Sequence, residues 1–283
     1  MIYVSTGGRC SHTAFETAKD FLDHGITSIE LSGGIYSASY KKDLLSLSNK
    51  ATFQVHNYFP PPLVPFVFNL ASQNSDILKQ SMGHARKAME LVSDLGGRVY
   101  SFHAGFRFDP KVSDLGKSLS ANVLYKRKDC LKLFKETVLI LSEEAKNKGI
   151  SLLIENNVLN NHNLNKFGED PLLLTNPIEI IEFMKDMPLN VGVLLDVAHL
   201  KVSSKSLGFN LLDATRQIHP WVQGYHLSDN NGSSDSNQLL TSDSWFWKVL
   251  DKSKAYYVIE VYGVNTSELL NQYNLVYEKI KHV

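Results

Sequence analysis

The sequence predicts an α/β fold in which the chain forms a single closed (β/α)8 barrel. Three observations predict it. Short apolar runs rich in β-branched and aromatic residues alternate with longer helical stretches. Eight such pairs fit within the 283 residues. The first apolar run is followed by Gly7-Gly8-Arg9, which lacks the G-x-G-x-x-G spacing of a phosphate-binding turn. That turn normally marks a doubly wound open sheet, which is the alternative architecture.

Each of the eight apolar runs is short, as a buried strand is, and polar loop residues follow it. Because helical stretches separate the runs, the strands are expected to pair in parallel through right-handed crossovers. Eight βα units of this kind form a barrel. The expected strands, in chain order, are Ile2–Ser5, Ser28–Leu31, Thr52–His56, Val99–His103, Ser151–Glu155, Val191–Asp196, Val222–Leu227 and Tyr256–Glu260.

Helical stretches fill the segments between these strands. The first helix is expected to end at His24-Gly25 and the fourth at Lys148-Gly149, because glycine adopts the left-handed conformation that often follows a helix. Asn74 is expected to cap the third helix, since its side chain can accept from the free amides of the first turn. The expected helices lie near residues 11–24, 38–49, 74–96, 117–148, 174–186, 207–219, 243–252 and 265–281.

No Pro- or Ser-rich linker and no low-complexity segment divides the chain, so residues 1–283 are expected to form one domain. Two unusual stretches, Pro60-Pro61-Pro62 and the polar residues 160–170, follow the third and fifth strands. In a barrel, both would be loops over the face that carries active sites.

The charge balance limits the partners that this chain can have. Lys+Arg and Asp+Glu both number 29, so the formal net charge is zero, which argues against a nucleic-acid partner.

The two cysteines, Cys10 and Cys130, are too few for a disulfide framework and fit a reducing compartment. No stretch approaches the roughly 20 apolar residues of a membrane span. The protein is therefore expected in the cytoplasm, and the composition indicates no particular oligomeric state.

Metal-competent side chains end six consecutive strands. Because the carboxyl ends of parallel strands meet on one face of a barrel, these residues are expected to converge there. Carboxylates inside apolar runs, such as Glu155 after Leu152-Leu153-Ile154, are costly unless they are paired or bind a metal. The six candidate metal ligands are His56, His103, Glu155, Asp196, His226 and Glu260.

Each of these residues also has a purely structural interpretation. A single strand histidine such as His56 is more often a hydrogen-bonded structural residue. Glu155 could cap a loop through Asn156-Asn157, and Asp196 could cap the turn that begins at Val197. The remaining histidines fall on helices or loops and are expected to be solvated: His12, His24, His84, His162 and His219.

Four motifs, taken in order, carry a family resemblance that covers essentially the whole chain. The segment Gly192-Val193-Leu194-Leu195-Asp196-Val197-Ala198-His199 resembles the G-x-x-x-D-x-x-H signature of the xylose-isomerase-like TIM barrels. Tyr225-His226-Leu227-Ser228-Asp229-Asn230 resembles the H-L-x-D-N motif of their seventh strand. Leu153-Ile154-Glu155-Asn156 and Val258-Ile259-Glu260 are similar to their fifth-strand and eighth-strand glutamates. This superfamily contains sugar isomerases, ketose 3-epimerases and nucleases of the endonuclease IV type.

In the epimerase branch, the resemblance implies one divalent metal held by Glu155, Asp196, His226 and Glu260. The metal would chelate adjacent sugar oxygens and polarise the carbonyl. Glu155 and Glu260 would then be catalytic, moving a proton through an enediolate as acid and base. His199 matches a histidine that contacts substrate oxygens in that branch.

The nuclease branch implies further metals. Asn69-Leu70-Ala71-Ser72 and Ser101-Phe102-His103-Ala104-Gly105 are similar to endonuclease IV motifs. That family holds a second zinc with two histidines, matched by His56 and His103, together with the fifth-strand glutamate. Its third zinc uses the histidine matched by His199 and an Asp-x-His pair, for which this chain has Asp235-Ser236-Asn237.

Two loops differ from the family patterns. The loop after the second strand, Ser32-Gly33-Gly34-Ile35-Tyr36, has no Lys or Arg for phosphate backbones. The loop after the seventh strand, residues 231–242, lacks the P-G-x-G segment common in sugar epimerases. Arg9 and Arg107 are the candidates for contact with a substrate phosphate, unless they are ordinary surface arginines. Aromatic residues after the third and fourth strands either wall a sugar pocket or pack the loops together: Tyr58, Phe59, Phe66, Phe106 and Phe108.

These observations favour a metal-dependent isomerase or epimerase that acts on a sugar, a sugar phosphate or another sugar derivative. The alternative is an endonuclease IV-like apurinic/apyrimidinic-site phosphodiesterase with two or three zinc ions. A barrel that binds a sugar without turning it over is the third possibility, which the retained Glu155 and Glu260 disfavour. Mixed imidazole and carboxylate ligands suit Zn, Mn, Co or Fe(II), and one or two ions per chain are expected.

Overall fold

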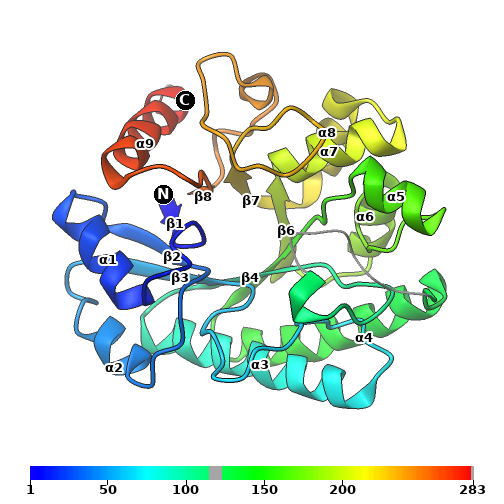
Figure 1. Ribbon diagram of the computed structural model, residues 1–283, viewed down its shortest axis with the longest axis horizontal. Helices are drawn as coiled ribbons and strands as arrows, with labels where there is room; N and C mark the ends of the chain where they lie inside the picture. The colour runs from blue at the N-terminus through cyan, green and yellow to red at the C-terminus, as the bar shows by residue number, and fades with distance from the viewer. Residues whose placement is uncertain (115–122, 282–283) are drawn as a thin grey trace.

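Eight parallel strands close into a barrel in chain order, in the computed structural model, which describes residues 1–114 and 123–281 (Figure 1). The closure is made by β1 and β8, which pair in parallel from Ile2 with Tyr257 to Val4 with Ile259. This closure confirms the predicted (β/α)8 barrel and excludes the open sheet. The strands are β1 (Ile2–Ser5), β2 (Ser28–Leu31), β3 (Thr52–His56), β4 (Val99–His103), β5 (Ser151–Glu155), β6 (Val191–Asp196), β7 (Val222–Leu227) and β8 (Tyr256–Ile259).

The predicted strand bounds are confirmed throughout, except that β8 ends one residue early, at Ile259. Helices surround the barrel, and none in the described part of the chain is long and apolar enough to cross a membrane. They are α1 (Ala14–Asp23), α2 (Tyr40–Leu45), α3 (Ser75–Asp94), α4 (Arg127–Lys146), α5 (Asn161–Phe167), α6 (Pro177–Met184), α7 (Val197–Leu207), α8 (Leu211–Ile218) and α9 (Thr266–Ile280).

Several helix boundaries differ from the prediction. The fourth helix begins at Arg127; residues 117–122 of its expected span lie outside the described residues, and residues 123–126 are not helical. The helix expected near 243–252 is only a 3₁₀ turn, η3 (Trp245–Lys248). The capped helix ends were predicted correctly: the Asn74 side chain accepts from Asp76 and Ile77 amides, and Gly25 and Gly149 have positive φ.

Two helices that the sequence reading missed begin directly at the active-site face. The Asn160 side chain accepts from the Asn163 amide and caps α5, inside the stretch that was expected to be a polar loop. The Asp196 side chain accepts from the His199 amide and caps α7, which therefore starts directly after the last residue of β6. A side-chain cap satisfies amides that the first helical turn leaves free, so each asparagine or aspartate fixes where its helix begins.

The barrel interior below the active-site face is packed with apolar side chains. Leu153, Leu194 and Val258 form a buried cluster with Tyr3 and Tyr256. Since side chains alternate along a strand, the first three point to the same side as the residues two positions later, which are Glu155, Asp196 and Glu260. The polar residues therefore lie on a solid apolar floor, and the barrel is a packed core rather than a pore.

Candidate metal centre

The structure brings the six candidate ligands together at the carboxyl ends of β3 to β8. Glu155, Asp196, His226 and Glu260 each offer a ligand atom within 4.8 Å of the others, and all four residues are buried. His56, His103 and Glu155 form a second group that meets the same distance limit. Residues far apart in the sequence thus share one site because each strand end faces the same mouth of the barrel.

The donor atoms of these groups fit a metal because several of them are buried and have no hydrogen-bond partner. Both carboxylate oxygens of Glu155, Oδ2 of Asp196 and Nδ1 of His226 are inaccessible and make no hydrogen bond. Nδ1 of His103 is also inaccessible and makes no hydrogen bond. A buried polar atom without a partner costs about 1–3 kcal/mol, and more when charged. A divalent cation would satisfy these atoms, and carboxylate with imidazole is a donor set that such ions accept.

The two oxygens of Glu155 face the two groups separately. Oε1 lies 3.4 Å from Nδ1 of His226. Oε2 lies 3.3 Å from Nε2 of His56 and 3.6 Å from Nδ1 of His103. Glu155 could therefore serve both groups, with one oxygen toward Asp196, His226 and Glu260 and the other toward the two histidines.

The acidic residues of the centre affect one another's ionisation. Burial raises the pKa of Asp196 to about 8; His199 opposes this shift, while Glu155 and other acidic neighbours add to it. Burial also opposes ionisation of Glu260, but the adjacent His226 outweighs it and lowers the pKa of that carboxyl to about 2. Three carboxylates in one dry site repel each other, which is the electrostatic setting that a divalent cation relieves.

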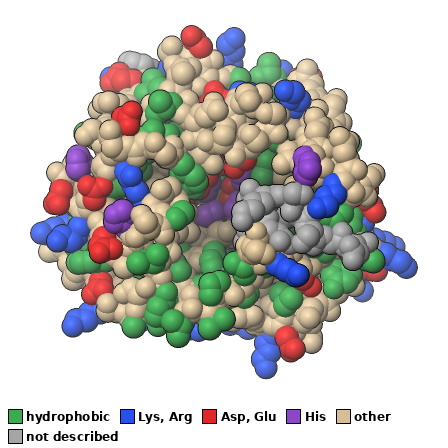
Figure 2. Space-filling model, viewed as in Figure 1, with side chains coloured by type: hydrophobic (Ala, Val, Ile, Leu, Met, Phe, Trp, Pro, Cys, Tyr) green, Lys and Arg blue, Asp and Glu red, His purple; other side chains and the backbone are tan. Residues whose placement is uncertain are grey.

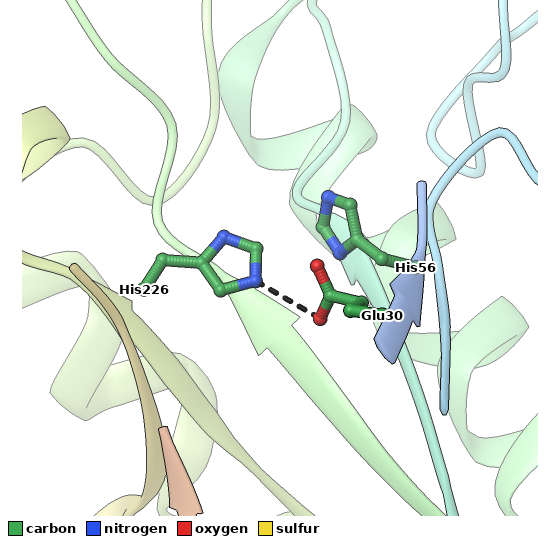
Figure 3. A group of neighbouring side chains, drawn as sticks. All are labelled: Glu30, His56 and His226. Atoms are coloured by element: carbon green, nitrogen blue, oxygen red, sulfur yellow. Dashed lines mark hydrogen bonds and ion pairs between the residues drawn. The ribbon is translucent and has the colours of Figure 1, made fainter. Parts of the chain in front are cut away.

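Glu30 on β2 is a candidate site residue that the sequence did not indicate. It is fully buried, and its Oε2 lies 3.2 Å from Nε2 of His226 (Figure 3). The Tyr256 hydroxyl donates to the same oxygen. Because Nε2 faces Glu30, the other ring nitrogen of His226, Nδ1, points at Glu155 and Glu260. A carboxylate that accepts from one ring nitrogen fixes the tautomer and directs the other nitrogen to a metal.

His56 and His199 are oriented by similar contacts. Nδ1 of His56 lies 2.9 Å from the Ser101 hydroxyl, so its Nε2 is directed at Glu155. Nδ1 of His199 lies 2.9 Å from the Asn156 carbonyl and Nε2 lies 3.2 Å from Oδ2 of Asp235. A carbonyl only accepts hydrogen bonds, so Nδ1 of His199 carries a proton whether the ring is neutral or charged. Ser101 and Asn156 belong to the motif segments, but the sequence alone did not assign them these roles.

Asn156 also ties two strand ends together. Its side chain donates from Nδ2 to the Asp196 carbonyl and accepts at Oδ1 from the Asp196 amide. The ends of β5 and β6, which carry Glu155 and Asp196, are therefore held at a fixed spacing by one buried amide. The sequence interpretation of Asp196 as a cap is confirmed as well, because its Oδ1 caps α7 while its Oδ2 stays without a hydrogen-bond partner.

A cavity of about 580 Å³ opens above these residues. Figure 2 shows the hollow, with histidine and acidic side chains at its floor and hydrophobic side chains along its rim. His103, His199, Asp235, Glu260 and Tyr262 line it on the metal-centre side. The Tyr262 hydroxyl donates to Oε1 of Glu260 over 2.7 Å, a contact that the sequence did not indicate.

The aromatic residues of the third and fourth loops divide into two sets. Tyr58, Phe66 and Phe106 line the cavity. Phe59 and Phe108 are buried at 0 % and 3 % exposure and pack the loops together. Three of these aromatic residues therefore wall the cavity, and the other two pack the loops.

The two candidate phosphate-binding arginines do not line this cavity. Arg107 is 4 % exposed, and its Nη1 donates to Glu169 and to the Asp170 carbonyl. Arg9 donates to the Thr266 hydroxyl, in a separate surface depression beside α1 and the start of α9. Arg107 is thus a buried structural residue rather than a surface one, and no Lys or Arg is found among the described residues that line the cavity.

His84 is not solvated, which corrects the prediction for it. It is 5 % exposed, and its ring stacks on Tyr58 with 5.2 Å between centroids. The residue lies on the buried face of α3, three positions after buried Ser81 and four before buried Ala88, a spacing that the sequence contains. His12, His24 and His162 are exposed as expected, and His219 is half-buried.

His84 makes unfolding depend on pH. Burial lowers its pKa to about 4, so the folded protein leaves it neutral where the unfolded chain, with a pKa near 6.5, takes up a proton. Its contribution is fully present above about pH 6.5 and is lost as the pH falls to about 4, by roughly 3 kcal/mol in all. Urea unfolding of wild type and His84→Phe at pH 7 and 4 measures this. An equal loss of stability in both proteins would contradict it.

The comparisons with known proteins support the fold. A family model described as xylose isomerase-like TIM barrel matches residues 18–252. A D-tagatose 3-epimerase-like protein has a similar structure, with a TM-score of 0.74 at 18 % identity, over 99 % of this chain and 97 % of that one. The structure of an L-ribulose 3-epimerase matches with a TM-score of 0.72 at 14 % identity, over 99 % of this chain and 94 % of that one. The structure of a Thermus thermophilus protein soaked with ZnCl2 matches with a TM-score of 0.62 at 15 % identity, over 98 % of each chain. No curated protein matches in sequence.

Proposed function

The chain belongs to the xylose isomerase-like TIM barrel family, and from that premise we propose that it is a divalent-metal-dependent isomerase or epimerase of a sugar or sugar derivative. The observation that carries the proposal is the pair Glu155 and Glu260, two buried carboxylates that share one metal-competent group. Proton transfer next to a carbonyl needs such a pair of acid and base. The proposal extends to residues 1–283 acting as one domain in a reducing compartment such as the cytoplasm.

The ligand set of the proposed centre follows from the donor atoms. Asp196, His226, Glu260 and Oε1 of Glu155 would hold one ion, and His56, His103 and Oε2 of Glu155 would hold a second. Zn, Mn, Co and Fe(II) all accept these donors. When bound, the metal would polarise a substrate carbonyl and stabilise the negative charge that develops there.

The protein's own residues would do the remaining work. Glu155 and Glu260 would remove and return the proton of the carbon beside the carbonyl, giving an enediolate between the two steps. The Tyr262 hydroxyl bonds to Oε1 of Glu260 and so holds that carboxylate in one rotamer. His199, which lines the cavity next to Asp235, would contact substrate oxygens. We assign no substrate contact to Arg9 or Arg107, because both guanidinium groups are engaged away from the cavity.

One observation favours the alternative function, an apurinic-site phosphodiesterase. Glu155 faces two ligand groups, an arrangement suited to a two-metal phosphodiesterase. The absence of Lys and Arg from the described cavity lining weighs against it, because binding to phosphate backbones depends on such contacts. Asn237, a poor zinc ligand, lines the cavity beside Asp235 and weakens the case for a third zinc.

Solvent exchange distinguishes these functions. Metal-loaded protein is incubated with a panel of ketoses and aldoses in deuterated water, and deuterium beside the carbonyl is measured by mass spectrometry and NMR. We expect incorporation by wild type and by Glu136→Gln, which changes an exposed residue of α4, and a loss of at least about 100-fold in Glu260→Gln. If no sugar gains deuterium while abasic DNA is cleaved, the isomerase proposal is wrong and the phosphodiesterase replaces it.

A further inference from the structure

The cavity above the metal centre is large for a free monosaccharide. Its volume of about 580 Å³ lies within the roughly 300–1,000 Å³ of sites that take drug-sized ligands. The metal-centre side carries His103, His199 and Glu260, where the reacting sugar would lie. A second region extends from there to the loops that follow β3 and β4, and a monosaccharide held at the metal centre would leave it unfilled.

This second region has an apolar wall that mixes aromatic and aliphatic residues. Tyr58, Phe66 and Phe106 supply rings, and Val67, Val112 and Leu172 supply aliphatic surface. A bare sugar can stack one face on an aromatic ring, but aliphatic side chains give its hydroxyl groups nothing to bond. Surface of this kind favours an apolar group, which gains about 25 cal/mol for each Å² removed from water.

The wall is fixed before any ligand arrives. The Phe66 amide donates to the Tyr58 hydroxyl over 2.6 Å, and the Tyr58 ring stacks on buried His84. Phe106 pairs with Leu172 through an antiparallel bridge, which joins the fourth loop to the fifth. A ligand that binds a preformed apolar surface does not have to order side chains first. Less of the binding free energy is therefore lost to ordering.

The charges around the cavity disfavour an anionic substrate. Its described lining has no Lys or Arg, whereas Asp235 and Glu260 are acidic. Two asparagines, Asn57 and Asn237, line it with left-handed φ of 45° and 43°. Amides donate to and accept from hydroxyl groups, so the polar part of the lining fits an uncharged polyol.

We propose that the substrate is an uncharged glycoside whose sugar ring carries the reacting carbonyl on a carbon other than the anomeric one: the sugar lies at Glu155 and Glu260, and its apolar aglycone lies on the wall formed by Tyr58, Phe66, Phe106 and Val112. This inference rests on the proposed function for the placement of the sugar. It goes beyond that function by naming the second half of the substrate. The cavity joins the two parts without a break, since one lining contains both Glu260 and Phe66.

Calorimetric titration of zinc-loaded protein with matched glycosides tests the proposal. The probes are methyl and phenyl β-glycosides of D-glucose, D-galactose and D-xylose, which lack the carbonyl and therefore bind without reacting, with glucose 6-phosphate as the anionic probe. We expect at least one phenyl glycoside to bind about tenfold more tightly than its methyl partner, the gain from burying an apolar group. Val112→Asn and Phe66→Ser should remove most of this preference. Val64→Asn, a change at an exposed valine outside the lining, should keep it.

Each result decides the question. Equal affinity for phenyl and methyl partners, tightest binding by the sugar phosphate, or absence of binding by every phenyl glycoside overturns the proposal. A preference that survives in Val112→Asn and Phe66→Ser overturns the assignment to this wall. Binding is measured without turnover, so the proposed function can fail in the deuterium experiment while the phenyl preference remains, and the preference can fail while deuterium exchange persists.

Discussion

Replacing Glu155 by glutamine is expected to remove both metals at once. Each carboxylate oxygen faces a different ligand group, so a neutral amide at this position leaves Asp196, His226 and Glu260 as one incomplete set and His56 with His103 as another. Metal affinity should fall more than about 100-fold at both positions, since the lost group is a direct ligand rather than an outer contact. Deuterium exchange into sugars should fall below detection.

The matched variant is His103→Ala. His103 belongs only to the second group, and its side chain is 29 % exposed, so its loss should disturb the fold little. Metal analysis after dialysis should give two ions per chain for wild type, one for His103→Ala and none for Glu155→Gln. Two ions retained by folded Glu155→Gln, judged by circular dichroism, would contradict the bridging role. A single ion in wild type would reduce the centre to the Asp196–His226–Glu260 set.

The second large effect is expected from Glu30→Gln, although Glu30 is not among the residues that line the cavity. The carboxylate accepts at Oε2 from Nε2 of His226 and from the Tyr256 hydroxyl. An amide of the same shape keeps the volume but removes the charge that orients and polarises His226. Loss of such an outer contact typically weakens metal binding by about 10–100-fold. Saturating metal should restore most of the exchange rate, because Glu30 positions a ligand and touches no substrate.

A metal titration of the activity separates this role from a purely structural one. The metal concentration for half-maximal exchange should rise in Glu30→Gln while the rate at saturation changes little. Glu30→Asp, which keeps the charge on a shorter side chain, should recover part of the affinity. If the variant folds and its metal requirement equals that of wild type, Glu30 has no positioning role. Breaking one partner of a buried pair also costs about 3–5 kcal/mol, so the melting temperature of the metal-free protein should fall.

The strands and their polar ends could be read from the sequence because both follow a local pattern. Leu152-Leu153-Ile154-Glu155 is a short apolar run that ends in a costly carboxylate, and the barrel topology places all such ends on one face. Glu30 escaped this reading because it lies inside β2 and is followed by buried Leu31. Its role depends on which side of the strand it occupies and on the distant His226, and no local pattern contains that pairing.

The loops were harder to predict for related reasons. The helix α7 was missed because Asp196 acts at once as the last strand residue, a helix cap and a candidate ligand, so no loop separates strand from helix. The helix expected near 243–252 contains Trp245, Phe246 and Trp247, whose packing in a 3₁₀ turn outweighs a weak helical preference. His84 was expected to be solvated because it is a histidine on a helix, outside the strand ends. Its spacing from Ser81 and Ala88 nevertheless indicated a buried face.

Seven successive strands or strand ends supply the six candidate ligands and Glu30, from Glu30 on β2 to Glu260 after β8. Glu30 on β2 contacts His226 on β7 across the barrel, and this contact exists only once β1 and β8 have paired. The free energy of metal binding then adds to the stability of the whole barrel, by about 4 kcal/mol when free metal is a thousandfold above its dissociation constant. A supply of metal would therefore raise the number of destabilising substitutions that this chain can carry during evolution.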